Sequence, residues 1–164
     1  SISNEDEEVP IANEVEYAKG YLTIQKMRYK DKLEFQIDVD SSILYIPLIK
    51  LVLQPIIENA IYHGLDRMVD EGHIQIRIYS EGEDVIFRVE DNGVGMSEEQ
   101  CRSILHKEPG DNSGIGIKNV NDRIKIYFGK EYGLFIESEL DVGTCVTIRM
   151  PKVEENAAAG WEKV

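Results

Sequence analysis

Apolar and polar residues alternate in five separate stretches of the chain. The first covers residues 33–39, where every second residue is apolar, beginning with Leu33. Similar stretches follow at residues 74–78, 85–90, 134–139 and 144–150. A period of two residues predicts β-strands that have one buried face and one wet face.

Apolar residues spaced three or four apart predict helices over residues 10–29, 47–63, 97–106 and 114–129. Pro55 falls inside the second of these ranges and removes a backbone donor, so we expect the helix to kink or restart there. The first helix either packs on its own domain or is made to pack against a partner, and the pattern does not separate the two.

These elements predict an α/β fold. The expected architecture is a two-layer sandwich, in which a mixed sheet of about five strands is covered on one face by about three helices. Residues 1–9 are strongly acidic and residues 152–164 contain an alanine run. Both ends are therefore expected to be unstructured tails.

Charge and cysteine content narrow the class of partner. The chain has 18 Lys and Arg against 31 Asp and Glu, a net charge of −13, which argues against nucleic acid and anionic membranes. A nucleotide remains compatible, because a magnesium ion and backbone N–H groups can offset phosphate charge.

Cys101 and Cys145 form no CxxC pair, and a reducing compartment is expected. The most apolar run, residues 46–57, is too short to span a bilayer.

The segment Glu90-Asp91-Asn92-Gly93-Val94-Gly95-Met96 joins a predicted strand to a predicted helix. An Asn-Gly pair between apolar runs is typical of a hairpin, but a hairpin needs a second strand directly afterwards, and a helix follows instead. We interpret the segment as the floor of a pocket. Its glycines let the backbone approach a ligand closely, and Asp91 presents a fixed acceptor.

A second group of polar residues lies on the predicted helix at 47–63. Asn59 and His63 are four residues apart and share a face. An asparagine among apolar neighbours is costly unless it is paired. Asn59 is therefore either satisfied by backbone groups or an oxygen ligand for a hard cation.

Along the chain come the Asn59 helix, then the Asp91-x-Gly93-x-Gly95 segment, then the glycine-rich turn at residues 113–117. In this order they resemble the N, G1 and G2 boxes of the ATP-binding domain of histidine kinases, the Bergerat fold. Residues 53–64, with the sequence LQPIIENAIYHG, look like the N box of LytS/YesM-type sensor histidine kinases. Residues 114–120 with Arg123 resemble the G2 segment, although Ile117 replaces the usual leucine. The resemblance covers about residues 9–151. It implies that residues 10–30 are the helical end of a dimerisation region and 31–151 the ATP-binding catalytic domain.

The resemblance also implies roles for single residues. Asn59 would hold a magnesium ion between the phosphates of ATP, and Asp91 would accept a hydrogen bond from the adenine 6-amino group, which disfavours guanine. Glu58 either assists through a bound water or is a surface acid, and His63 either lies near the phosphates or is structural. The other ATP-binding positions that it implies are Gly93, Gly95, Met96, Gly114, Ile115, Gly116, Ile117, Asn119, Arg123 and Thr144. Asn119 and Arg123 have the alternative of a helix surface position and a salt bridge. Residues 107–113 would form a lid over the nucleotide.

Kinases of this family phosphorylate a histidine in a characteristic motif of their dimerisation helices. None of the histidines of this chain, His63, His73 and His106, lies in such a motif. We therefore expect the catalytic half of a longer, homodimeric protein, located in the cytoplasm and anchored in the cell membrane by upstream segments. It would pass phosphate to its own dimerisation domain and then to a response regulator.

Three other functions of the same fold are alternatives. ATPases like gyrase and heat-shock chaperones carry a glutamate base four residues before the magnesium-binding asparagine, where this chain has Pro55. A Ser/Thr-kinase anti-sigma factor would not explain the match at residues 9–28. A nucleotide-binding module without turnover would differ from a kinase only in lacking phosphate transfer.

Overall fold

The computed structural model of the chain describes residues 8–50, 52–65, 68–106 and 115–152. Its main sheet has five strands in the order β2-β4-β5-β7-β6. β2 and β4 run parallel, and the other neighbours run antiparallel, so the predicted mixed sheet is confirmed. The strands are β2 (Leu33–Val39), β4 (Gly72–Glu81), β5 (Asp84–Asp91), β6 (Gly133–Glu139) and β7 (Gly143–Pro151).

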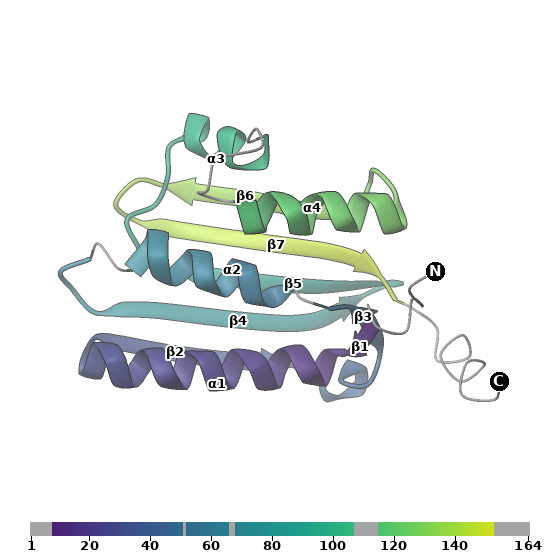
Figure 1. Cartoon of the computed structure of the whole chain (residues 1–164), viewed down its shortest axis with the longest axis horizontal. Helices are drawn as coiled ribbons and strands as arrows, with labels where there is room; N and C mark the ends of the chain where they lie inside the picture. The colour runs from purple at the N-terminus through teal and green to yellow at the C-terminus, as the bar shows by residue number, and fades with distance from the viewer. Residues whose placement is uncertain (1–7, 51, 66–67, 107–114, 153–164) are drawn as a thin grey trace.

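Helices cover one face of this sheet, as predicted (Figure 1). α1, α2 and α4 lie beside one another over the strands, and α3 sits near the β6 edge. α2 continues directly into one π-helical turn. The helical segments are α1 (Ile11–Tyr29), α2 (Leu53–Asn59), the π-helical turn (Ala60–Leu65), α3 (Glu98–Leu105), α4 (Ile115–Phe128) and two short 3₁₀ turns, Lys30–Lys32 and Ser41–Ile43.

One apolar core lies between the helices and the sheet, and α1 belongs to it. Ile11, Ala18 and Leu22 of α1 are fully buried, in the same cluster as Ile56 of α2 and Phe87 of β5. The first helix therefore packs on its own domain, which answers the question that its pattern left open. No helix within the described residues is long and apolar enough to cross a membrane.

The prediction of a helix starting at residue 47 was wrong. Pro47–Ile49 forms a short strand, β3, which pairs antiparallel with β1 (Glu8–Pro10). α2 begins only at Leu53, which places Pro55 in its first turn. Proline fits there because the N–H groups of the first turn have no partner within the helix. Of the two expected effects of Pro55, a kink in the helix or a new helix start, the structure shows the helix start.

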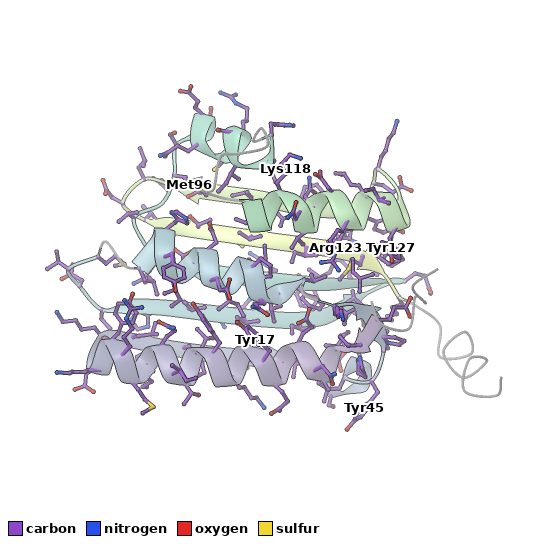
Figure 2. The ribbon with its side chains drawn as sticks, in the orientation of Figure 1. Tyr17, Tyr45, Met96, Lys118, Arg123 and Tyr127 are labelled. Carbon is purple, nitrogen blue, oxygen red and sulfur yellow. The ribbon has the colours of Figure 1, made fainter. Side chains whose placement is uncertain are left out.

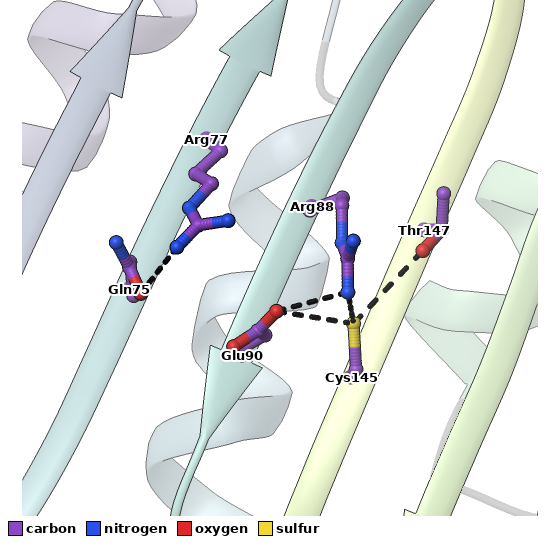
Figure 3. A network of polar contacts seen from close by, with 6 residues as sticks. All are labelled: Gln75, Arg77, Arg88, Glu90, Cys145 and Thr147. Atoms are coloured by element: carbon purple, nitrogen blue, oxygen red, sulfur yellow. Dashed lines mark hydrogen bonds and ion pairs between the residues drawn. The ribbon is translucent and has the colours of Figure 1, made fainter.

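The other face of the sheet carries polar side chains on its three central strands (Figure 3). Arg88 donates to the Glu90 carboxylate over 2.9 Å and lies 3.4 Å from the Cys145 sulfur. Along β5 and β7 these side chains alternate with core residues such as Phe87 and Val146, while Ile86 is buried on the polar side, outside that core. The one-faced burial of the strands therefore follows the period of two in the sequence.

The connection after β5 runs to a helix, not to a second strand, so the rejection of a hairpin at Asn92-Gly93 was correct. Ser97 caps α3: its hydroxyl accepts from the Gln100 N–H, and the Gln100 side chain accepts from the Ser97 N–H. This reciprocal pair is a capping box. The predicted lid, residues 107–113, lies outside the described residues.

Candidate functional site

Asp91 is the last residue of β5 and lies opposite Thr144 of β7. One of its carboxylate oxygens accepts the Gly93 N–H over 2.8 Å. Burial raises the pKa of Asp91 from its usual 3.8 to about 6, although the backbone N–H groups of Gly93 and Thr144 act in the opposite direction. The site thus holds a partly desolvated carboxylate in a fixed orientation, which suits an acceptor for one specific donor.

The two glycines after Asp91 allow the chain to pass close to its own backbone. A Cβ on Gly93 would lie 2.4 Å from the Gly64 carbonyl, and one on Gly95 would lie 2.0 Å from the Glu139 carbonyl oxygen. The φ angle of Gly95 is +71°, a conformation that favours glycine. Neither position tolerates a side chain, whatever binds nearby. The prediction that these glycines approach a nucleotide stays a prediction.

Two further glycines touch Asp91 and were not among the predicted site residues. A Cβ on Gly64 would lie 2.9 Å from the Asp91 carboxylate, and one on Gly143 would lie 2.0 Å from the Asp91 carbonyl oxygen. Gly64 ends the N box resemblance, so its place in that motif was a signal. Gly143 stands in an ordinary turn between two strands, and nothing around it in the sequence points to Asp91.

Thr144 and Met96, both predicted to bind ATP, are joined through Ser138, which was not predicted. The Ser138 hydroxyl lies 2.7 Å from the Thr144 hydroxyl, accepts the Met96 N–H over 2.8 Å and donates to the Gly143 carbonyl over 2.9 Å. Thr144 is only 8% exposed. The network fixes the start of β7 against the segment that follows Asp91.

Asn59 is the last residue of α2, and the π-helical turn after it carries His63 and Gly64. Asn59 is half-buried, and the structure gives its side chain no hydrogen bond within the described residues. His63 is exposed on that turn. Since Gly64 touches Asp91, one helical turn links the predicted magnesium residue to the predicted adenine residue. π-helical turns inside helices occur frequently at functional sites.

The Glu58 carboxylate contacts two side chains. It accepts from the Tyr17 hydroxyl of α1 over 3.1 Å and from the Gln54 amide over 3.0 Å. These bonds occupy one of its oxygens on the side of α1. The role of Glu58 through a bound water stays a prediction.

α4 brings the G2 residues beside the start of α2. A Cβ on Gly116 would lie 2.9 Å from the Cβ of Pro55, so the absence of a side chain lets the two helices meet. Ile117 is 1% exposed and belongs to the core, while Asn119 is exposed. Arg123, labelled in Figure 2, donates to the Lys50 carbonyl over 2.6 Å, just before α2. The remaining G2 positions are described only in part: Gly114 lies outside the described residues, and of Ile115 only the backbone is described.

A magnesium ion fits the donor set at Asn59. Within the described residues, no group of three or more His, Cys, Asp or Glu could form a complete metal cage. Mg²⁺ does not need one, because it usually keeps several waters and shares one or two protein oxygens with substrate phosphates. A half-buried amide oxygen without a protein partner in the described part of the chain is compatible with that mode.

Comparisons with known proteins agree with this geometry. The chain is 36% identical over 151 residues to the sensor histidine kinase YesM of Bacillus subtilis, covering 92% of this chain and 25% of YesM. It is 31% identical to the sensor histidine kinase BtsS of Escherichia coli strain K12, covering 94% of this chain and 26% of BtsS. This chain therefore spans about a quarter of the length of these relatives.

A solved structure shows the same fold. The catalytic domain of the histidine kinase ThkA superposes with a TM-score of 0.63 at 18% identity, covering 88% of this chain and 94% of that one. Residues 46–154 match the family described as histidine kinase-, DNA gyrase B-, and HSP90-like ATPase. This matched region contains the predicted N and G1 residues and the G2 helix, and the chain therefore belongs to the histidine kinase-, DNA gyrase B- and HSP90-like ATPase family.

Proposed function

We propose that this chain is the ATP-binding catalytic domain of a sensor histidine kinase, which transfers the γ-phosphate of ATP to a histidine on a separate dimerisation domain. The observation that carries the proposal is the half-buried Asp91 carboxylate, held at the end of β5 by the Gly93 N–H and joined through Gly64 to the Asn59 turn. Similarity to YesM and BtsS, which are named sensor histidine kinases, supports it.

Asp91 would recognise the base. An ionised carboxylate accepts hydrogen bonds only, so it pairs with the 6-amino group of adenine and opposes the carbonyl oxygen that guanine presents there. Thr144 lies directly opposite Asp91 and would border the adenine end of the site. Base selection therefore depends on one acceptor whose position is set by backbone contacts.

The phosphates would lie between α2 and the start of α4. The N–H groups at a helix N-terminus favour anions, which suits the backbone of Ile115, Gly116 and Ile117 at the start of α4. Gly114 is added to them on the strength of the family resemblance alone. Asn59 would hold Mg²⁺ on the phosphates, and this ion would neutralise charge that develops during transfer. Glu58, His63, Asn119 and Arg123 are assigned to the same region on the strength of the family resemblance. Met96, which is joined to Thr144 through Ser138, would lie at the adenine end instead.

Phosphoryl transfer depends on positioning and electrostatic stabilisation, and the acceptor must be in line with the leaving group. Pro55 occupies the position at which related ATPases carry a group that activates water, so the chain should hydrolyse ATP very slowly. The acceptor would come from the protein's own dimerisation domain, in a cytoplasmic homodimer that is anchored in the membrane and passes phosphate to a response regulator.

The nucleotide part of the proposal is tested by calorimetric titration with Mg-ATP and Mg-GTP. We expect ATP to bind more tightly, Asp91→Asn to remove most of that preference, and Asn59→Ala to weaken mainly the magnesium-dependent part. Equal affinity for the two bases in the unmodified chain would contradict the adenine role of Asp91.

The transfer part is tested with γ-labelled ATP and a dimerisation domain from a related full-length kinase. We expect little free phosphate from the chain alone, and acid-labile label on the added domain. Brisk phosphate release by the chain alone would favour an ATPase. Label on His63, His73 or His106 would contradict a separate acceptor.

A further inference from the structure

α1 carries a set of polar side chains on the side that faces the N box helix. We call Glu14, Tyr17 and Tyr21 the polar seam. Glu14 and Tyr17 form hydrogen bonds to residues at the start and end of α2. Burial, followed by the neighbouring Tyr62 of the π-helical turn, raises the pKa of the Tyr21 phenol. The apolar side of α1 already holds it on the sheet through Ile11, Ala18 and Leu22. The polar seam therefore adds directional hydrogen bonds between α1 and α2, which the apolar packing does not supply.

Glu14 caps α2 from another helix. Its carboxylate is 4% exposed and accepts the Val52 N–H over 2.7 Å and the Leu53 N–H over 3.4 Å. Val52, the residue at the N-cap position, has no side chain that could do this. A negative charge here satisfies orphan donors and interacts favourably with the helix dipole. The start of α2 is thus fixed to α1 by a residue 38 positions earlier in the chain.

Tyr17 holds the other end of α2. Its hydroxyl donates to Glu58, the residue directly before Asn59, and Figure 2 labels it on α1. Burial, helped by the Glu58 and Glu14 carboxylates, raises the pKa of the Tyr17 phenol to about 12, so it remains a donor at neutral pH. The Tyr17 ring stacks on Tyr21, with centroids 5.9 Å apart. Both ends of the seven-residue helix are therefore attached to α1.

Removing a carboxylate from water costs free energy, which the bonds of Glu14 to the Val52 and Leu53 N–H groups offset. Because these hydrogen bonds are directional, they also specify one position of α2 against α1. Here the helix that is positioned ends in Asn59.

We propose that Glu14 and Tyr17 are positioning residues: through them the placement of α1 sets the position of Asn59, and so controls the binding of magnesium and phosphate but not of the base. The proposal rests on the proposed function, since it assigns a regulation to that same site. By linkage, the effect is reciprocal, so binding of Mg-ATP should tighten the contact between α1 and α2.

The test compares Mg-ATP with adenosine, which lacks phosphates and reports the Asp91 end alone. Glu14→Met removes the acceptor but keeps an unbranched side chain for the buried space, and Glu14→Gln restores an amide oxygen. Tyr17→Phe removes one hydroxyl and leaves the ring, which makes it the variant least prone to misfolding. Glu16→Gln is the matched control, because Glu16 is exposed on the same helix, 3.7 Å from Lys19.

We expect Glu14→Met to weaken Mg-ATP binding roughly tenfold, as loss of an outer-shell support usually does, while adenosine affinity stays unchanged. Glu14→Gln should recover most of the loss. Tyr17→Phe should weaken Mg-ATP binding by roughly fivefold, the effect of one hydrogen bond. Glu16→Gln should match the unmodified chain for both ligands.

Three outcomes can be told apart. If the unmodified chain fails to bind Mg-ATP, the proposed function fails and the positioning role falls with it. If it binds, but Glu14→Met or, where that variant does not fold, Tyr17→Phe binds both ligands as the unmodified chain does, the positioning role is overturned and the function stands. An equal loss for both ligands would indicate a merely structural seam, and would also overturn it.

Discussion

The two ends of the proposed nucleotide site are held by different kinds of contact. The adenine end, defined by Asp91, Gly95 and Thr144, is fixed by backbone meeting backbone at three glycines, Gly93, Gly95 and Gly143. The phosphate end, defined by Asn59 and Gly116, belongs to helices that meet through side chains, at Pro55 and at the polar seam of α1. The two ends meet at Gly64, on the turn after Asn59, whose backbone lies against Gly93. The residues of the adenine end therefore cannot shift without moving the backbone, while the positions of the residues at the phosphate end depend on where the neighbouring helices lie.

This difference suits two tasks. A base is discriminated by one hydrogen bond, whose value is lost if the acceptor moves, so a rigid frame favours specificity. Phosphate and magnesium must be placed in line with an acceptor that arrives on another segment, so an adjustable frame allows control. The contact of Gly116 with the Pro55 ring can change when two helices shift as units, whereas the Glu139 carbonyl oxygen, 2.0 Å from a Cβ added at Gly95, can move only with the backbone of its own turn.

The largest effect is expected from adding a side chain at the adenine end. Gly95→Ala introduces a Cβ that lies 2.0 Å from the Glu139 carbonyl oxygen at a φ of +71°. We expect the free energy of unfolding to fall by about 3 kcal/mol or more, from the clash and the left-handed conformation together. Chemical denaturation of the purified variant measures it.

Gly82→Ala is the matched control, because Gly82 has a φ of +59° but nothing lies within 4 Å of its added Cβ. It should lose only about 1 kcal/mol, the cost of the left-handed conformation alone. Equal losses at the two positions would mean that the close approach at Gly95 does not constrain the adenine end.

The second prediction concerns the charge at the adenine end. Asp91 has a folded-state pKa of about 6, above its usual 3.8. The folded protein therefore holds a proton between about pH 4 and 6 that the unfolded chain releases. The resulting stabilisation is complete below pH 4 and is lost as the pH rises through 6, where the ionised carboxylate costs roughly 3 kcal/mol. Asn at this position cannot ionise.

Asp91→Asn should therefore be more stable than the unmodified chain at pH 7.5 by up to roughly 3 kcal/mol, and the gain should disappear near pH 4. The same variant should lose its preference for adenine. Urea titrations across this pH range give the difference between the two proteins, and Asp31→Asn, at an exposed carboxylate, controls for net charge. A pH-independent difference would show that burial does not penalise the Asp91 charge.

The main sheet could be predicted from the sequence because its strands have one dry face. Alternation revealed β2 with its observed bounds. The helix at 47–52 was predicted wrongly because Pro47–Ile49 is a short apolar run, which fits a strand or a helix equally well. Its partner β1 has only three residues, too few to show a period.

The candidate site could be predicted only where its residues form local motifs. Asp91 and Asn59 were predicted in this way, and their roles stay predictions. Glu14, Ser138 and Gly143 were not, because each acts on a residue more than a turn away: Glu14 on Val52, Ser138 on Met96 and Gly143 on Asp91. A polar residue on a helix looks the same in a sequence whether it faces water or caps another helix. Tertiary contacts of this kind need the folded chain.

The smallest effect is expected from adding a side chain at the phosphate end, where the neighbour is a side chain. The added Cβ of Gly116→Ala would lie 2.9 Å from the Pro55 Cβ, a rigid ring atom, so α2 and α4 have to separate to relieve the contact. The better helix propensity of alanine offsets part of that cost, and we expect the free energy of unfolding to fall by about 1 kcal/mol. The separation should nevertheless weaken Mg-ATP binding by about threefold to tenfold, because the supports of a metal ligand have moved.

Gly20→Ala is the control, since Gly20 is a helical glycine on α1 with nothing within 4 Å of its added Cβ. It should stabilise the protein by about 0.5–1 kcal/mol and leave nucleotide binding unchanged. Calorimetric titration of both variants with Mg-ATP and with adenosine measures the two affinities. If Gly116→Ala lowers the affinity for adenosine as much as the affinity for Mg-ATP, the two ends of the site are not independent. The contrast between a rigid and an adjustable end would then be wrong.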